Sequence, residues 1–180
     1  MQKQQRHSGM SRISRQLVFF ACILFLPFIF SSFNAIRMKT VTFIAADGLE
    51  ITADEYILES GKPYVLLFHE QGSSRGEFST IARRLCKLDY NCLAVDLRNG
   101  EKYDYVSNET ARLLREKRLE AGFHDIEKDV LAAIRYVQDK SDQPVILFGS
   151  GANGSLSLSA ALSDSSVRAV VALSPGEYFM

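Results

Sequence analysis

The residues with the clearest chemical meaning are Gly149-Ser150-Gly151-Ala152, directly after the short apolar run Val145–Phe148. A buried strand that ends in a sharp turn and continues into a helix lifts one side chain above the sheet. A nucleophilic serine or cysteine is presented for acyl transfer in this way. Counting two residues on from Gly149 places Gly151 at the apex of the turn. Glycine adopts such a strained conformation without a Cβ penalty, so we expect the turn to form without a nucleophile.

Ser150 is the alternative nucleophile at this turn. Its side chain leaves the backbone one residue early, and neighbouring side chains at a sharp turn point in different directions. A displacement of this kind spoils alignment with the groups that stabilise the transition state. The sequence therefore predicts impaired catalysis, although the backbone N–H of Ala152 still faces the position of an oxyanion.

Two further polar clusters follow predicted strands. His69-Glu70-Gln71-Gly72 comes after the apolar run Tyr64–His69. Val95-Asp96-Leu97-Arg98-Asn99-Gly100 ends the run that starts at Cys92. We interpret Asp96 and Arg98 as structural residues that fix loops around the site, because ion-pair networks serve structure as well as chemistry.

The elements that position these clusters follow from hydrophobic periodicity and turn residues. A hairpin around Asp47-Gly48 is predicted over residues 39–57. Ser74-Arg75-Gly76-Glu77 has the form of a helix capping box. Further strands are predicted over residues 64–69, 92–97, 145–148 and 167–173, and helices over residues 78–89, 109–118, 125–138 and 153–162. This alternation predicts an α/β fold with a mostly parallel, doubly wound sheet and helices on both faces.

The order of these features over residues 39–180 resembles the α/β-hydrolase superfamily, and more narrowly its dienelactone-hydrolase-like and small serine esterase branch. The resemblance implies ancestral hydrolysis of a carboxylic ester or lactone, without a cofactor. It also implies that Glu70 or Gln71 lends a backbone N–H to the oxyanion hole. His69, Glu70, Gln71 and Ala152 are then the expected oxyanion and pocket residues, although for His69 we favour an imidazole that fixes the loop over one that faces the site. A small ester or acyl compound is the expected ligand.

In the family that it resembles, the nucleophile is followed along the chain by an acid and then by a histidine. Both follow the strand that corresponds to residues 167–173, and this sequence ends at Met180. We therefore expect an incomplete triad and a fold without its last strands and helix. We also expect Val167–Leu173 to form an exposed sheet edge at which a partner chain can pair.

Composition and charge narrow the classes of protein. The chain has 180 residues, of which 47% are apolar, and 21 basic residues balance 21 acidic ones. This balance argues against a nucleic-acid-binding protein, which normally carries a basic excess. Cys22, Cys86 and Cys92 are too few for a disulfide framework, and no Cys/His spacing matches a metal site.

The N-terminal segment predicts export. A basic leader with Lys3, Arg6, Arg12 and Arg15 precedes the apolar run at residues 17–33. A helix of that length just crosses the hydrocarbon core, and the leader keeps the N-terminus in the cytoplasm. We therefore expect residues 1–37 to form a membrane anchor, with a hydrolase-like domain at residues 38–180 outside the cytoplasm. A cleaved signal, which would yield a secreted domain, is the alternative.

Three functional hypotheses remain. The first is a membrane-anchored, esterase-like hydrolase whose catalysis is impaired. The second is a non-catalytic pseudohydrolase that binds a ligand or a protein. The third is an active hydrolase that uses Ser150 together with groups from another chain. Hydrolysis of a nitrophenyl ester separates the third from the other two.

Overall fold

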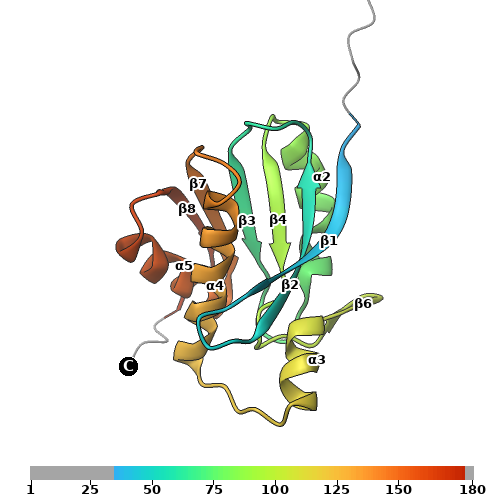
Figure 1. Ribbon diagram of the computed structural model, residues 1–180, viewed down its shortest axis with the longest axis vertical. Helices are drawn as coiled ribbons and strands as arrows, with labels where there is room; N and C mark the ends of the chain where they lie inside the picture. The colour runs from blue at the N-terminus through green and yellow to red at the C-terminus, as the bar shows by residue number, and fades with distance from the viewer. Residues whose placement is uncertain (1–34, 177–180) are drawn as a thin grey trace, which may run out of the picture. The chain divides into compact units, whose positions relative to one another are not determined.

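A computed structural model describes residues 35–176. The main sheet orders its strands β1-β2-β4-β3-β7-β8 (Figure 1). These strands are β1 (Arg37–Ile44), β2 (Glu50–Ile57), β3 (Tyr64–Phe68), β4 (Asn91–Val95), β7 (Val145–Ser150) and β8 (Val167–Leu173). The β1–β2 hairpin joins β4 in antiparallel register, whereas β4, β3, β7 and β8 run parallel to one another. The prediction of a mostly parallel sheet behind a leading hairpin is therefore confirmed for these residues.

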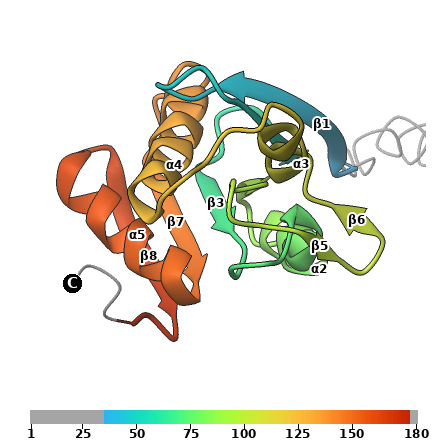
Figure 2. The same ribbon diagram turned by 90° about the horizontal axis from the view of Figure 1, so that it is seen from below.

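Helices cover both faces of the sheet, as the alternation of elements predicted. The α-helices are α2 (Ser79–Cys86), α3 (Glu109–Glu116), α4 (Phe123–Gln138) and α5 (Gly151–Ser163). Because successive side chains of a strand point to opposite faces, Leu66 and Leu67 of β3 enter different cores. Leu66 lies in the core that α4 and α5 cover, and Leu67 lies in the core that α2 covers. Figure 2 shows α2 apart from the α4–α5 pair, with β3 between them.

The central strands are wholly buried because both of their faces are covered. Every residue of β3 and β4 is buried, including Leu66, Phe68 and Leu93 with no exposed surface. Strands with two covered faces are expected to be continuously apolar rather than alternating. His69 follows β3, Asp96 follows β4, and the third polar cluster lies at the turn after β7. One sheet therefore positions all three polar clusters.

The first helix differs from its prediction. A 3₁₀ helix, η2 (Arg75–Phe78), precedes α2 in place of one continuous α-helix. The Ser74 side chain caps η2 by accepting a hydrogen bond from the Gly76 N–H. Glu77 does not complete the predicted capping box, because its carboxylate accepts the backbone N–H of Glu70 instead. Half of the capping box is therefore correct, and the other half supports the loop after β3.

The polar segment after β4 contains a small hairpin that the sequence did not predict. Strands β5 (Lys102–Tyr103) and β6 (Val106–Ser107) pair in antiparallel fashion. Asp104, with φ of +49°, lies between them. Such short strands leave no periodic pattern for sequence analysis to detect.

The expected anchor at residues 17–33 and the basic leader before it lie outside the described residues. Within residues 35–176, no helix is both long and apolar enough to span a membrane.

Candidate active site at the turn after strand β7

The turn from β7 into α5, residues 149–153, is called the elbow below. Ser150 ends β7 in an extended conformation, and Gly151 begins α5 with φ of +54°. This left-handed conformation costs an L-residue roughly 1–2 kcal/mol, which explains why glycine suits the position. Gly151 and Ala152 are both buried. The strand-to-helix turn is therefore present, with a residue at its apex that has no side chain and so no nucleophile.

The side chain of Glu70 occupies the space above Gly151. A Cβ atom placed on Gly151 would overlap both carboxylate oxygens of Glu70. The Oε2 atom of Glu70 accepts a hydrogen bond from Ser150 Oγ at 2.9 Å, and Oε1 accepts one from the backbone N–H of Gln71 at 3.3 Å. The structure thus brings together Ser150, Gly151, Glu70 and Gln71, which the sequence placed in two separate clusters.

The loop that carries Glu70 is held from several sides. The Glu70 N–H donates to Glu77 Oε2 at 3.1 Å, and the Ser73 N–H donates to the Glu70 carbonyl at 3.0 Å. The Gly72 N–H donates to the Asn99 carbonyl at 3.0 Å. The backbone of this loop is fixed, while the Glu70 side chain is exposed to solvent.

His69 supports this loop from below and has no free nitrogen. It is completely buried, its Nδ1 lies 2.7 Å from the Glu70 carbonyl, and its Nε2 accepts the Leu97 N–H at 2.9 Å. The carbonyl requires a proton on Nδ1, so the ring is the neutral tautomer with an acceptor at Nε2. Burial lowers the pKa of His69 and reinforces this state. The expected pocket residue is therefore a support of the loop.

Two asparagines join the elbow to the other loops, and no role was predicted for them from the sequence. Asn153 Nδ2 donates to the His69 carbonyl at 2.5 Å. Asn99 Nδ2 donates to Asn153 Oδ1 at 2.9 Å. Both pairs bridge residues more than 50 positions apart, so only the folded sheet brings them together. They fix the elbow relative to the loops after β3 and β4.

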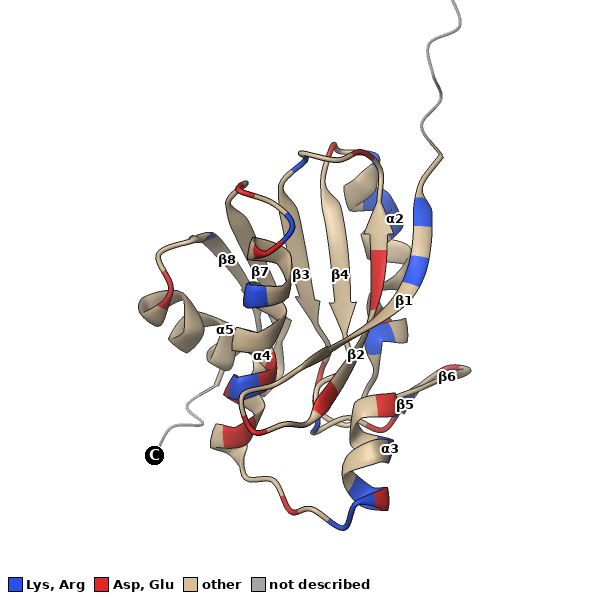
Figure 3. Ribbon diagram, in the orientation of Figure 1, with Lys and Arg blue, Asp and Glu red and all other residues tan. Residues whose placement is uncertain are grey.

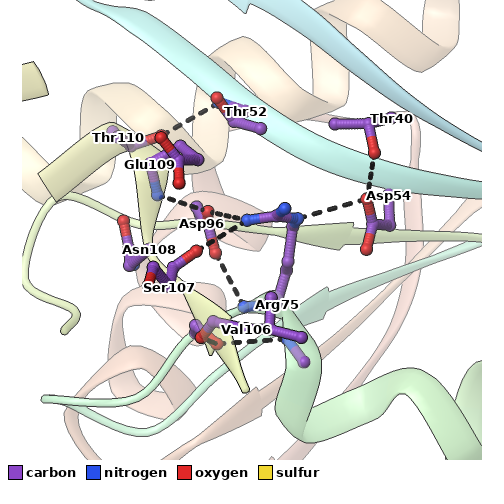
Figure 4. Close-up of polar contacts among 12 residues, drawn as sticks. Thr40, Thr52, Asp54, Arg75, Asp96, Val106, Ser107, Asn108, Glu109 and Thr110 are labelled. Carbon is purple, nitrogen blue, oxygen red and sulfur yellow. Dashed lines mark hydrogen bonds and ion pairs between the residues drawn. The ribbon is translucent and has the colours of Figure 1, made fainter. Parts of the chain in front are cut away.

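Asp96 and Arg98 have structural roles, as predicted. Asp96 accepts hydrogen bonds from the backbone and the Nη1 of Arg75 and from the backbone N–H of Glu109, the first residue of α3 (Figure 4). Burial raises the pKa of Asp96, and the Arg75 contacts oppose that rise. Arg98 is held between Asp129 and Asp47, with Nη2–Oδ1 and Nη1–Oδ2 distances of 2.6 and 2.7 Å.

A cavity of about 210 Å³ lies beside the loops that carry Gln71 and Asn99. Its walls combine side-chain amides with apolar groups: they are formed by Gln71, Arg98, Asn99, Leu114, Ala121, Gly122, Phe123 and Ile126. The charge of Arg98 is balanced by its two aspartates, so the cavity offers a mixed surface of neutral polar and apolar groups. Such a lining is typical of small-molecule pockets, although this one is smaller than most.

The charges of the described residues show no segregation by sign. Figure 3 shows acidic and basic residues interspersed over the helices and strands. No group of three or more His, Cys, Asp or Glu residues is arranged to hold a metal ion within residues 35–176. Cys86 and Cys92 are buried free thiols.

Solved structures with a similar arrangement are α/β-hydrolases. The α/β-hydrolase GrgF from a Penicillium species matches with a TM-score of 0.63 and 18% identity, covering 77% of this chain and 46% of its own. An esterase from Pyrococcus furiosus matches with a TM-score of 0.59 and 21% identity, covering 79% and 52%. A dienelactone hydrolase from Anabaena variabilis matches with a TM-score of 0.59 and 21% identity, covering 76% and 62%.

These comparisons show that the chain has the α/β-hydrolase fold. No family model matches the sequence, and no curated protein matches it either. The chain spans about half the length of the solved structures named above, from 46% to 62%. The expected superfamily is therefore supported at the level of the fold.

Proposed function

We propose that this protein descends from serine hydrolases of carboxylic esters or lactones. We propose further that its own catalysis is impaired, because position 151 carries no nucleophile. The observation that supports this proposal most directly is the elbow itself. Gly151 has no nucleophile, and the Glu70 carboxylate occupies the space in which one would stand. Serine hydrolysis also needs a base within hydrogen-bond reach of the nucleophile.

The histidines of the described residues do not supply that base. Both ring nitrogens of His69 contact backbone groups. His124 lies on an exposed position of the first turn of α4. No hydrogen bond of the described residues joins either ring to the side chain of Ser150 or of Glu70.

Gly151→Ser tests the proposal. We expect hydrolysis of 4-nitrophenyl acetate not to rise above the wild-type level, because the new side chain displaces Glu70 and meets no imidazole. Gly61→Ser is the control, since Gly61 also has positive φ, +84°, but has open space around its Cβ position. A rise of about a hundredfold or more in Gly151→Ser alone, the range that a positioned general base contributes, would show that a working base faces residue 151.

A non-catalytic binding module is the second candidate, and the cavity beside Gln71 favours it. A cavity of about 210 Å³ with both apolar and polar walls has room for a small acyl or aromatic group. We propose a small ester or acyl compound as its ligand. Binding of 4-nitrophenyl butyrate without hydrolysis, measured by calorimetry, supports this candidate, and the absence of any binding contradicts it.

We also propose that residues 17–33 anchor the protein in a membrane, with the domain outside the cytoplasm. The support is the sequence: an apolar run of helix-spanning length behind a basic leader. The balanced charge of the chain gives no support to a nucleic-acid partner.

A protein partner is proposed at the outer edge of the sheet. β8 is the last strand in the sheet order, and Val171 and Leu173 are 41% and 45% exposed. Unpaired edges of apolar strands are sites at which another strand adds. Chemical cross-linking followed by peptide mapping checks whether this edge lies at a contact between chains.

A further inference from the structure

Ser150 makes an unusual contact for a residue at its position. It is the N-cap of α5, where a serine side chain normally accepts a hydrogen bond from the first turn of the helix. Here the side chain caps no backbone N–H, and the hydroxyl donates instead to Glu70 Oε2 at 2.9 Å. Ser150 is only partly buried and Glu70 is exposed, so both groups are accessible to a small molecule.

This contact joins a nucleophile to a group that can take its proton. A side-chain nucleophile within hydrogen-bond reach of a base is the arrangement that activates hydroxyl groups in enzymes. The two carboxylate oxygens have different partners: Oε2 holds the Ser150 hydroxyl, and Oε1 accepts the Gln71 N–H at 3.3 Å. A backbone donor therefore contacts the same carboxylate as the Ser150 hydroxyl.

We propose that Ser150 and Glu70 form a catalytic dyad that hydrolyses small, uncharged esters with good leaving groups. The proposal rests on the ester chemistry proposed above and adds a nucleophile and a base to it. It assigns the reaction to residue 150 in place of residue 151.

The surroundings of the dyad select the class of substrate. The cavity beside Gln71, which neither Ser150 nor Glu70 lines, combines apolar side chains such as Leu114 and Ile126 with polar groups. The guanidinium of Arg98 at this cavity is balanced by Asp47 and Asp129, so it offers little attraction to an anion. The carboxylates of Glu70 and Glu77 repel anionic substrates. An uncharged acyl group of modest size fits these conditions.

The reaction follows the usual course of acyl transfer. Ser150 Oγ attacks the carbonyl carbon, its proton passes to Glu70 Oε2, and the carbonyl electron pair moves to the oxygen, which the Gln71 N–H can stabilise. The intermediate collapses to an acyl-serine, and the departing alkoxide or phenoxide takes the proton from Glu70. Water then attacks the acyl-serine, with Glu70 first accepting and then returning a proton. Because a carboxylate is a weaker base than an imidazole, we expect slow turnover.

Covalent labelling of the full-length chain tests the dyad. A fluorophosphonate reacts when a serine Oγ attacks phosphorus and fluoride leaves with the bonding electron pair. We expect the adduct on Ser150, identified by mass spectrometry of the peptide, and none at that position in Ser150→Ala. Glu70→Gln keeps a hydrogen-bond acceptor but loses the base, so we expect labelling at least tenfold slower.

The chain offers a matched control in a second serine–glutamate contact. Ser159 Oγ donates to Glu127 Oε1 at 3.0 Å between α5 and α4, away from the elbow. We expect Ser159 to stay unlabelled, and Ser159→Ala to be labelled on Ser150 at the wild-type rate. The thermal midpoint of each variant, measured in parallel, separates lost reactivity from lost folding.

Two results would overturn the dyad. An unlabelled Ser150 in the folded wild type would remove the nucleophile, and equal labelling rates in wild type and Glu70→Gln would remove the base. Neither result affects the proposal about position 151, which depends on Gly151→Ser. Conversely, a rise in turnover in Gly151→Ser would contradict that proposal and leave the labelling of Ser150 in the wild type as a separate measurement.

Discussion

At the elbow, the side chain of one residue fills the space that another residue leaves empty. Gly151 lacks a side chain, and the Glu70 carboxylate from the loop after β3 occupies the volume that this leaves. The two residues are 81 positions apart in the sequence, so each depends on the other only in the folded chain. A larger residue at position 151 would push Glu70 away from Ser150 and would also have to adopt the unfavourable left-handed backbone conformation. The packing at the elbow and the position of the Glu70 carboxylate therefore depend on both Gly151 and Glu70.

His69 is the residue whose protonation most directly affects the loop that carries Glu70. Its Nε2 faces two donors, the Leu97 N–H at 2.9 Å and Asn108 Nδ2 at 3.1 Å. A proton on Nε2 would put a third donor against them inside the protein. Burial accordingly lowers the pKa of His69 below its ordinary value.

We predict that this histidine makes the free energy of unfolding fall in mild acid. Its pKa is lower in the folded state than in the unfolded state, so below about pH 6.5 the unfolded chain binds more protons. The contribution is complete above that pH and is lost as the pH falls, by at most about 1.4 kcal/mol per pH unit. Urea unfolding at a series of pH values from 7.5 to 5 measures the slope.

His69→Gln isolates this contribution, because its amide oxygen can accept the Leu97 N–H without titrating. We expect the variant to be less stable at neutral pH but to have a shallower slope in mild acid. Identical slopes in the variant and the wild type would show that another group causes the acid sensitivity.

At the scale of elements, one buried carboxylate connects three segments of the chain. Asp96 at the end of β4 binds Arg75 of η2 and the first N–H of α3, at Glu109. The Nε of Arg75 also lies 3.1 Å from Asp54 of β2, and Asp54 accepts a hydrogen bond from Thr40 of β1. This network places the loops around the elbow relative to the hairpin at the start of the domain (Figure 4).

Asp96→Ala is predicted to lower the free energy of unfolding by about 3–5 kcal/mol, the range for removing one partner of a buried ion pair. The loss has a clear cause, because Arg75 and the Glu109 N–H would both lose their acceptor. Chemical denaturation measures the loss. Asp142→Ala, at an exposed position, is the control, for which a change within about 0.5 kcal/mol is expected. Equal changes in the two variants would contradict the structural role of Asp96.

At the scale of the whole molecule, residues 35–176 have the fold of the compared α/β-hydrolases. Because β4, β3, β7 and β8 run parallel, the loops that follow β3, β4 and β7 meet at the carboxyl ends of the strands. Binding sites of open α/β sheets lie at these carboxyl ends. The same arrangement serves a working triad or a binding pocket equally well, so the fold alone does not choose between them.

The proposed membrane anchor concerns the attachment of the whole molecule. We predict that the full-length protein stays with the membrane pellet after carbonate extraction, because residues 17–33 are long enough to span the hydrocarbon core. Leu24→Arg, which places a charge in the middle of this run at a cost of about 2.5–3.5 kcal/mol, is expected to increase the extracted fraction. Extraction of the wild type as a species shorter by about 30 residues would favour a cleaved signal instead.

The sequence alone determined most of the elements and their order. Apolar runs such as Tyr64–Phe68 and Val145–Phe148 are local signals, as are the turn at Asp47-Gly48 and the spacing of Ile126, Val130 and Val137 in α4. The absence of a nucleophile at Gly151 could also be read directly. Two features were missed because they depend on contacts with other segments. One is the division of residues 75–86 into a 3₁₀ helix and α2, and the other is the β5–β6 hairpin.

Only the tertiary structure decided which side chains meet. Glu70 and Ser150 are 80 positions apart, and Asn99 and Asn153 are 54 apart. No local pattern encodes such contacts. They arise because parallel strands bring the loops after their carboxyl ends together. The sequence showed that position 151 lacks a reagent. The folded sheet determined that the carboxylate of Glu70 stands there with the hydroxyl of Ser150 as its donor.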